Sequence, residues 1–192
     1  VQLDHEEILG KGIENIAKEK AGIIKKNKHF IFGHSQMPNS LEQEISIKNA
    51  NSSILKKDFE VKETKKSILY LDKKNQFKLD DTKSIDSSSI AVAIRSFTSL
   101  GIKISENQIQ KALNSFSIKG RCEVISQDPF ILIDVCHNLS ALKKLKKELL
   151  KSNQGKKTAA IFASSKNSYD LISPLKEIID CWHFPRCKEK RL

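Results

Sequence analysis

The first residues suited to chemistry lie near the start of the chain. His5 follows Asp4, and an imidazole beside a carboxylate can supply nitrogen and oxygen ligands to a divalent cation. Lys20 stands two residues before Gly22, and a tight, partly desolvated turn there would lower the pKa of its amine. In so lysine-rich a chain, the alternatives are a hydrogen-bonded surface histidine and a solvated lysine.

A second candidate segment is Lys119-Gly120-Arg121. Gly120 permits close approach of the backbone to a neighbour, and Arg121 is one of only four arginines in the chain. The segment falls where we expect two domains to join, and clefts between domains commonly bind ligands. The alternative is a hinge that carries a surface arginine.

The third candidate segment is an apolar strand that runs directly into Asp134, His137 and Asn138. In an open α/β sheet the ligand crevice lies just beyond the carboxyl ends of the strands, where these polar residues would fall. Alternatively, Asn138 or Ser140 caps the following helix and Asp134 is a turn residue. A nucleophile pair of Cys136 and His137 is disfavoured, because adjacent residues rarely face each other productively.

The elements that position the first segment are a helix followed by short strands. Asp4 and Glu7 resemble a capping box, and apolar residues at helical spacing predict a helix that ends near Lys18. Beyond it, short β-prone runs separated by polar turns predict strands at 29–32, 54–55, 68–71 and 77–79, with one helix near 40–49.

Two amphipathic helices are predicted next. The first begins after Asp86 and ends at Gly101, with an apolar stripe of Ile90, Ala93, Ile94, Phe97 and Leu100. The second begins with a capping box of Ser105 and Gln108, and its buried face is expected to comprise Ile109, Ala112, Leu113 and Phe116.

The last third alternates between strands and helices. We predict a buried strand at 130–134, a helix at 140–150, a strand at 158–163, a helix at 169–179 and a strand at 181–184. Short connections between such elements predict a parallel, right-handed βαβαβ sheet, with a domain boundary near residue 117. The helix at 140–150 could lie on a membrane surface, but its leucine spacing favours a helix that covers a sheet.

Composition excludes several functional classes. The 192 residues carry a formal charge of +11, mostly from scattered lysines with few aromatic residues between them, which disfavours nucleic-acid binding. No apolar run approaches the ~20 residues of a membrane span. Four cysteines without a CxxC pair predict reduced thiols and a cytoplasmic protein. The N-terminus lacks both Met and a signal pattern, so we expect the chain to start partway through a longer protein.

Taken in order, the segments LDHEEILG, IAKEKAGIIKK, ISENQIQKAL, KGR and ILIDVCHN resemble the bifunctional folylpolyglutamate synthase/dihydrofolate synthase family, the folate branch of the Mur-ligase superfamily. The resemblance covers nearly the whole chain. It implies an α/β fold in which residues 1–117 form the C-terminal part of a central ATPase domain. Residues 118–192 would then form the first part of a Rossmann-like C-terminal ligase domain.

The resemblance also implies an activity and roles for single residues. Family members use ATP and Mg2+ to add L-glutamate to dihydropteroate or folates through an acyl phosphate, and we expect a monomer that binds only small molecules. His5 matches a magnesium ligand, and Lys20 matches a catalytic lysine whose carbamate lies near the metal. Arg121 and Asp134 match residues that engage the nucleotide, and His137 matches a catalytic histidine that faces the active-site cleft.

The chain also departs from the family pattern. It contains no GxxxxGK[ST] phosphate-binding loop, so we expect no ligase activity from the chain alone. Lys119 replaces the proline of PGR, Leu139 replaces the proline of HNP, and Ser89 stands where many relatives have asparagine. The alternatives are therefore a non-catalytic remnant with a Rossmann-like fold and a Mur-type amino-acid ligase that acts on cell-wall precursors.

Overall fold

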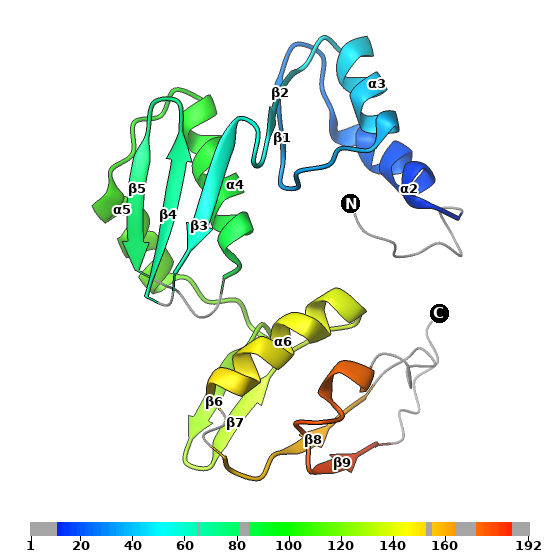
Figure 1. Ribbon diagram of the computed structural model, residues 1–192, viewed down its shortest axis with the longest axis vertical. Helices are drawn as coiled ribbons and strands as arrows, with labels where there is room; N and C mark the ends of the chain where they lie inside the picture. The colour runs from blue at the N-terminus through cyan, green and yellow to red at the C-terminus, as the bar shows by residue number, and fades with distance from the viewer. Residues whose placement is uncertain (1–10, 65, 81–84, 153–154, 164–171, 186–192) are drawn as a thin grey trace. The chain divides into compact units, whose positions relative to one another are not determined.

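The protein is described by a computed structural model that covers residues 11–64, 66–80, 85–152, 155–163 and 172–185. The chain divides into two compact units, Val1–Phe116 and Ser117–Leu192, and each is described here by itself (Figure 1). None of the helices within the described ranges is long and apolar enough to cross a membrane.

The first unit opens with a small parallel sheet and the helices that pack on it. Strands β1 (His29–Phe32) and β2 (Asn51–Ile54) pair in parallel, and α3 (Asn39–Ile47) forms the crossover between them. Helix α2 (Ile13–Lys20) continues into the short 3-10 helix η1 (Ala21–Ile23) and packs against α3. The apolar core of this layer comprises Ala17, Ala21, Ile24, Phe32 and Leu41.

The predicted first helix is corrected at both ends. Within the described residues α2 begins at Ile13, because Gly12 precedes it with a φ of 93°, a left-handed conformation that interrupts a helix. The helix also continues to Lys20 rather than ending near Lys18. The proposed capping pair Asp4 and Glu7 lies outside the described residues.

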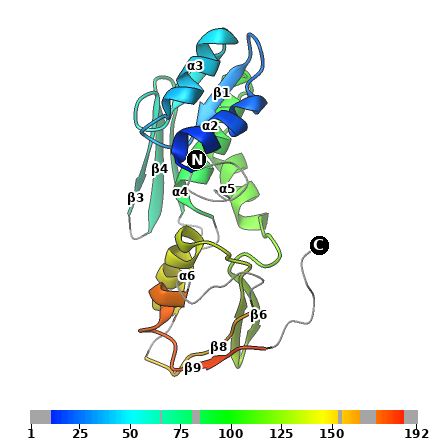
Figure 2. The same ribbon diagram turned by 90° about the vertical axis from the view of Figure 1, so that its right-hand side faces the viewer.

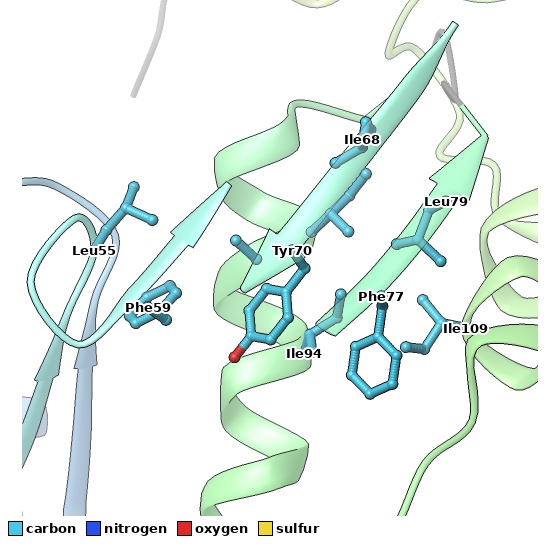
Figure 3. Close-up of a cluster of buried hydrophobic side chains, with 10 residues drawn as sticks. Leu55, Phe59, Ile68, Tyr70, Phe77, Leu79, Ile94 and Ile109 are labelled. Atoms are coloured by element: carbon cyan, nitrogen blue, oxygen red, sulfur yellow. The ribbon is translucent and has the colours of Figure 1, made fainter. Parts of the chain in front are cut away.

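The rest of the first unit is a three-stranded antiparallel sheet, β3 (Phe59–Glu63), β4 (Ser67–Asp72) and β5 (Gln76–Asp80). Helices α4 (Ser87–Ser99) and α5 (Glu106–Ser115) lie against it, with α4 in contact with β3 and α5 in contact with β5 (Figures 1 and 2). Buried apolar side chains fill the space between this sheet and its helices. Figure 3 shows this cluster, which includes Phe59, Ile68, Tyr70, Phe77, Leu79, Ile94 and Ile109.

The buried face of α4 differs from the predicted stripe. Ile90, Ala91 and Ile94 are buried, whereas Phe97 and Leu100 are 51% and 70% exposed. Because α4 packs against both β3 and β1, the face that it buries is rotated around the helix axis from the stripe that the sequence indicated.

Strand β3 was not predicted. Its sequence alternates apolar and charged residues for only five positions, so the apolar period is carried by Phe59 and Val61 alone. Strand β3 is held in place by its hydrogen-bonded pairing with β4. The residues of β3 themselves give no sign of that pairing partner.

A buried polar network joins the two sheets of the first unit. Arg95 on α4 donates from Nε and Nη2 to Ser53 Oγ at 3.1 and 3.0 Å, and from Nη1 to Asp72 Oδ2 at 3.4 Å. Tyr70 Oη donates to the same Asp72 oxygen at 2.7 Å. Since Ser53 lies on β2 and Asp72 on β4, Arg95 fixes one sheet against the other.

The second unit contains two separate two-stranded sheets. Strands β6 (Glu123–Gln127) and β7 (Phe130–Ile133) form an antiparallel hairpin, and β8 (Ala159–Ile161) pairs in parallel with β9 (Cys181–His183). Helix α6 (Leu139–Ser152) packs against the 3-10 helix η2 (Ser173–Leu175). Their common core comprises Leu142, Leu145, Leu175 and Ile179.

The predicted βαβαβ sheet is therefore only partly correct. The parallel pairing of the strands near 158–163 and 181–184 is confirmed, but β7 pairs with β6, a strand that was not predicted. Strand β7 is not the buried strand that was expected, because Phe130 and Ile133 are both 44% exposed. Of the helix expected at 169–179, the residues up to 171 lie outside the described part, and the remainder contains η2.

Candidate functional site

The second unit joins the Lys119-Gly120-Arg121 segment to the end of strand β7. The carboxylate of Asp134, one residue past β7, accepts hydrogen bonds from both segments. Its Oδ2 accepts from the backbone N–H of Cys122 at 2.8 Å, and its Oδ1 accepts from the backbone N–H of Cys136 at 2.7 Å. The thiol of Cys122 lies 3.5 Å from Oδ2. One half-buried carboxylate thus holds the two segments together.

Gly120 makes the second connection between these segments. Its carbonyl accepts from the backbone N–H of Val135 at 2.8 Å, and its own N–H donates to Glu123 Oε2 at 2.6 Å. Gly120 is buried at a φ of 69°, and a Cβ atom there would lie 2.8 Å from Val135 Cγ1. Only glycine fits this position, because both the backbone conformation and the close approach exclude a side chain.

Arg121 and His137 are the side chains that this junction presents. Both are exposed, whereas Gly120 is buried and Cys136 is half-buried. His137 Nδ1 lies 3.2 Å from the carbonyl oxygen of Val135. The structure therefore brings together the backbone segments of three predicted site residues, Arg121, Asp134 and His137.

The thiols beside Asp134 are not poised as nucleophiles. Burial, followed by the negative charge of Asp134, raises the pKa of Cys122 to about 12 and that of Cys136 to about 11. Both thiols are therefore protonated at neutral pH, and a protonated thiol is a poor nucleophile. This agrees with the low weight that the sequence gave to a Cys136–His137 nucleophile pair.

Asn138 has the structural role that the sequence left open. Its Oδ1 accepts from the backbone N–H of Ala141 at 2.9 Å, which is the hydrogen bond expected of a residue that caps the start of α6. His137 is thus held between a capped helix and the turn formed by Asp134.

The other predicted site residues, Lys20 and His5, belong by sequence to the first unit. Lys20 is the last residue of α2 and is exposed, so its setting matches the solvated alternative rather than a desolvated turn. A cation at the end of a helix is favoured by the helix dipole. His5 lies outside the described residues. Among the residues that the structure describes, no group of three or more His, Cys, Asp or Glu side chains could hold a metal ion.

Sequence reasoning missed the partners of Asp134. The contact with the Cys136 amide, two residues on, is an Asx turn, which an aspartate immediately after a strand can signal. The contact with Cys122 spans twelve residues, and no local pattern indicates it.

The chain was compared with known proteins by sequence. No protein-family model matches the chain. A protein of Buchnera aphidicola subsp. Baizongia pistaciae named dihydrofolate synthase/folylpolyglutamate synthase is 30% identical over 189 residues, which cover 95% of this chain and 44% of that protein. The Escherichia coli protein of the same name is 24% identical over 185 residues, with the same coverage of both chains. Over almost its whole length the chain is similar to proteins named dihydrofolate synthase/folylpolyglutamate synthase.

Solved structures agree with this relationship. The chain superimposes on E. coli FolC in complex with DHPP and ADP with a TM-score of 0.85 at 25% identity, covering 95% of this chain and 44% of that one. A bifunctional folylpolyglutamate synthase/dihydrofolate synthase from Yersinia pestis, complexed with AMPPNP and a Mn ion, gives a TM-score of 0.82 at 25% identity and the same coverage. The predicted α/β fold of the Mur-ligase type is confirmed.

The chain spans less than half the length of these synthases. Assignment of the two units to the end of an ATPase domain and the start of a ligase domain therefore stays a prediction, as do the roles of the site residues.

Proposed function

We propose that this chain is part of a cytoplasmic ATP-dependent ligase that joins L-glutamate to dihydropteroate or to folates through an acyl phosphate. The observation that carries the proposal is the likeness over 95% of the chain to a structure that holds ADP and DHPP. The junction built around Asp134 supports it, because such a junction gives exposed polar side chains a fixed backbone.

Arg121 is the proposed phosphate contact. Its guanidinium is always charged and offers several donors in one plane, which suits the oxygens of a phosphate chain. Its side chain is exposed while its backbone neighbours Gly120 and Cys122 are tied to Val135 and Asp134. The side chain can therefore reach a ligand from a backbone that hydrogen bonds hold on both sides.

His137 and Asp134 have distinct proposed roles at the same site. When His137 carries its proton on Nδ1, that N–H donates to the Val135 carbonyl and leaves Nε2 free to exchange a proton with a ligand. An ionised carboxylate has about four acceptor positions, and three of those on Asp134 face donors of this chain. The proposed nucleotide contact of Asp134 is a hydrogen bond that its carboxylate accepts from a ribose hydroxyl.

The proposed Mg2+ ligands are His5 and Lys20. Lys20 is exposed, so CO2 can reach its amine, and a carbamate there would supply the hard oxygen ligand that Mg2+ prefers. When bound, Mg2+ would neutralise phosphate charge. The described residues alone do not assemble a metal site, so the proposal depends on the modified lysine together with His5.

Two other functions fit fewer observations. A Mur-type ligase of cell-wall precursors would share the fold, but the curated relatives named above are folate-type synthases. A non-catalytic remnant would share the fold and lack turnover, and it is kept as an outcome of the test.

A chimera tests the proposal. In the E. coli relative, the 185 residues aligned with this chain would be replaced by it, and glutamate-dependent ADP release would be measured with dihydropteroate and with a folate. We expect turnover from the chimera and none from the 192-residue chain, whose sequence contains no GxxxxGK[ST] loop to hold the phosphates.

Arg121→Ala should lower kcat of the chimera by more than about ten-fold, which corresponds to about 1.4 kcal/mol for one lost charge-assisted contact. Lys119→Ala, which removes an exposed cation two residues away, is the matched control and should change kcat little.

A chimera that is folded and binds ADP but shows no turnover would support the non-catalytic remnant instead of the ligase.

A further inference from the structure

We propose that Asp134 is a positioning residue that locks the backbone of Arg121 to the backbone of His137. What those two side chains contact rests on the proposed function. The link between the two backbones rests on contacts within the second unit, and it is independent of the proposed function.

The contacts of Asp134 are with the residues next to the two presented side chains. Cys122, whose N–H donates to Oδ2, directly follows Arg121, and Cys136, whose N–H donates to Oδ1, directly precedes His137. Gly120, on the other side of Arg121, bonds to Val135. Arg121 is therefore held from both of its neighbours by the 134–136 turn.

The backbone around Arg121 needs such support. Gly120 and Cys122 have φ values of 69° and 45°, and for Cys122, which carries a Cβ, the left-handed region is costly. A residue stays in this conformation only when its surroundings hold it there. The 2.8 Å hydrogen bond from Cys122 N–H to Asp134 is the contact that holds it.

The charge of Asp134 strengthens this support. Hydrogen bonds from N–H groups to an ionised carboxylate are shorter and roughly twice as strong as neutral ones, and the two observed bonds measure 2.7 and 2.8 Å. An asparagine can keep one of the two bonds through its single oxygen, but its NH2 group cannot accept the other.

The first test uses the whole 192-residue chain and needs no activity. In Asp134→Asn, the amide protons of Cys122 and Cys136 should move upfield in the 1H–15N spectrum. Alkylation of both thiols should accelerate, because burial still raises their pKa but the Asp134 charge that adds to this effect is lost. Glu177→Gln removes an exposed charge from the same unit and should change neither. Unchanged amide shifts in Asp134→Asn would overturn the proposal.

The second test separates positioning from direct binding of the nucleotide. In the chimera, Asp134→Asn should lower kcat, and its loss combined with Arg121→Ala should be smaller than the product of the two single losses, because Asp134 acts partly through that arginine. Losses of kcat that multiply in full would overturn the proposal, because Asp134 would then act independently of Arg121, whereas a raised KM for ATP reports the separate ribose contact. If the unmodified chimera is inactive, the proposed function fails, while the amide shifts still decide whether Asp134 positions the junction.

Discussion

Asp72 shows how a buried charge is maintained in the first unit. Its side chain is only 1% exposed, yet it accepts hydrogen bonds from Tyr70 Oη at 2.7 Å and from the backbone N–H groups of Lys74 and Asn75 at 2.8 Å each. Burial acts to raise the pKa of Asp72, but these hydrogen bonds outweigh it and hold the pKa below the ordinary value of 3.8.

This environment predicts a pH dependence of stability. The folded-state pKa of Asp72 lies below its unfolded value, so its contribution is complete above about pH 4 and is lost as the pH falls through the folded-state pKa. Asp72→Asn should cost roughly 1–3 kcal/mol of unfolding free energy at pH 7 and flatten the decline toward pH 3, measured by urea unfolding. Asp80→Asn, which neutralises an exposed carboxylate at the end of β5, is the control. An equal loss at pH 7 and pH 3 would show that the charge of Asp72 is not the cause.

Gly120 gives a second prediction at the scale of a residue. Gly120→Ala forces a Cβ atom to within 2.8 Å of Val135 Cγ1 at a φ of 69° and should destabilise the second unit by roughly 1–3 kcal/mol in thermal unfolding. Gly155→Ala adds a Cβ atom at a similar φ of 77°, but no atom lies within 4 Å of it. This control therefore measures the cost of the backbone conformation alone. The loss for Gly120→Ala should exceed that control, and equal losses would mean that the contact with Val135 is unimportant.

Helix α5 shows an element whose start is determined locally. Ser105 Oγ accepts from the backbone N–H of Gln108 at 3.3 Å, and Gln108 Oε1 accepts from the backbone N–H of Ser105 at 2.9 Å. This reciprocal capping box confirms the one that the sequence predicted. It fixes the end of a helix that buries only Ile109 completely.

With so little buried surface, α5 should depend on its cap. Ser105→Ala should lower the unfolding free energy by about 1 kcal/mol, because the N–H of Gln108 loses its partner. Ser115→Ala, near the other end of the helix, removes a hydroxyl that bonds only to the Ala112 carbonyl and should be nearly neutral. Thermal unfolding of both variants checks this, and equal effects would contradict a special role for the cap.

At the scale of the whole molecule, the chain consists of two compact units that meet in sequence at Phe116 and Ser117. Phe116 is 45% exposed and lies just past the end of α5. An exposed aromatic residue between compact units is a preferred site for proteolysis. Phe97 is exposed to a similar degree but lies within α4, where the helical backbone protects it.

Brief chymotrypsin digestion should therefore cut first after Phe116 and release fragments of residues 1–116 and 117–192, identified by mass spectrometry. Phe116→Ala should slow that first cut. Initial cleavage after Phe97 would contradict the division into two units.

The sequence by itself determined the elements that depend on neighbours a few residues away. The cap of α5, the strand at His29–Phe32 and the helix that Asn138 begins follow from local hydrogen bonds and from periodicity. The sequence also singled out the short segments that contain Arg121, Asp134 and His137, and the roles of these residues stay a prediction.

Tertiary structure decided what depends on partners distant in sequence. Strand β6 was missed because its ladder is made with β7, and the buried face of α4 is set by its contacts with β3 and β1. The function of the Asp134 carboxylate as a link also emerged only in three dimensions. Its partner Cys122 lies twelve residues earlier, and a hydrogen bond over that distance leaves no periodic trace in the sequence.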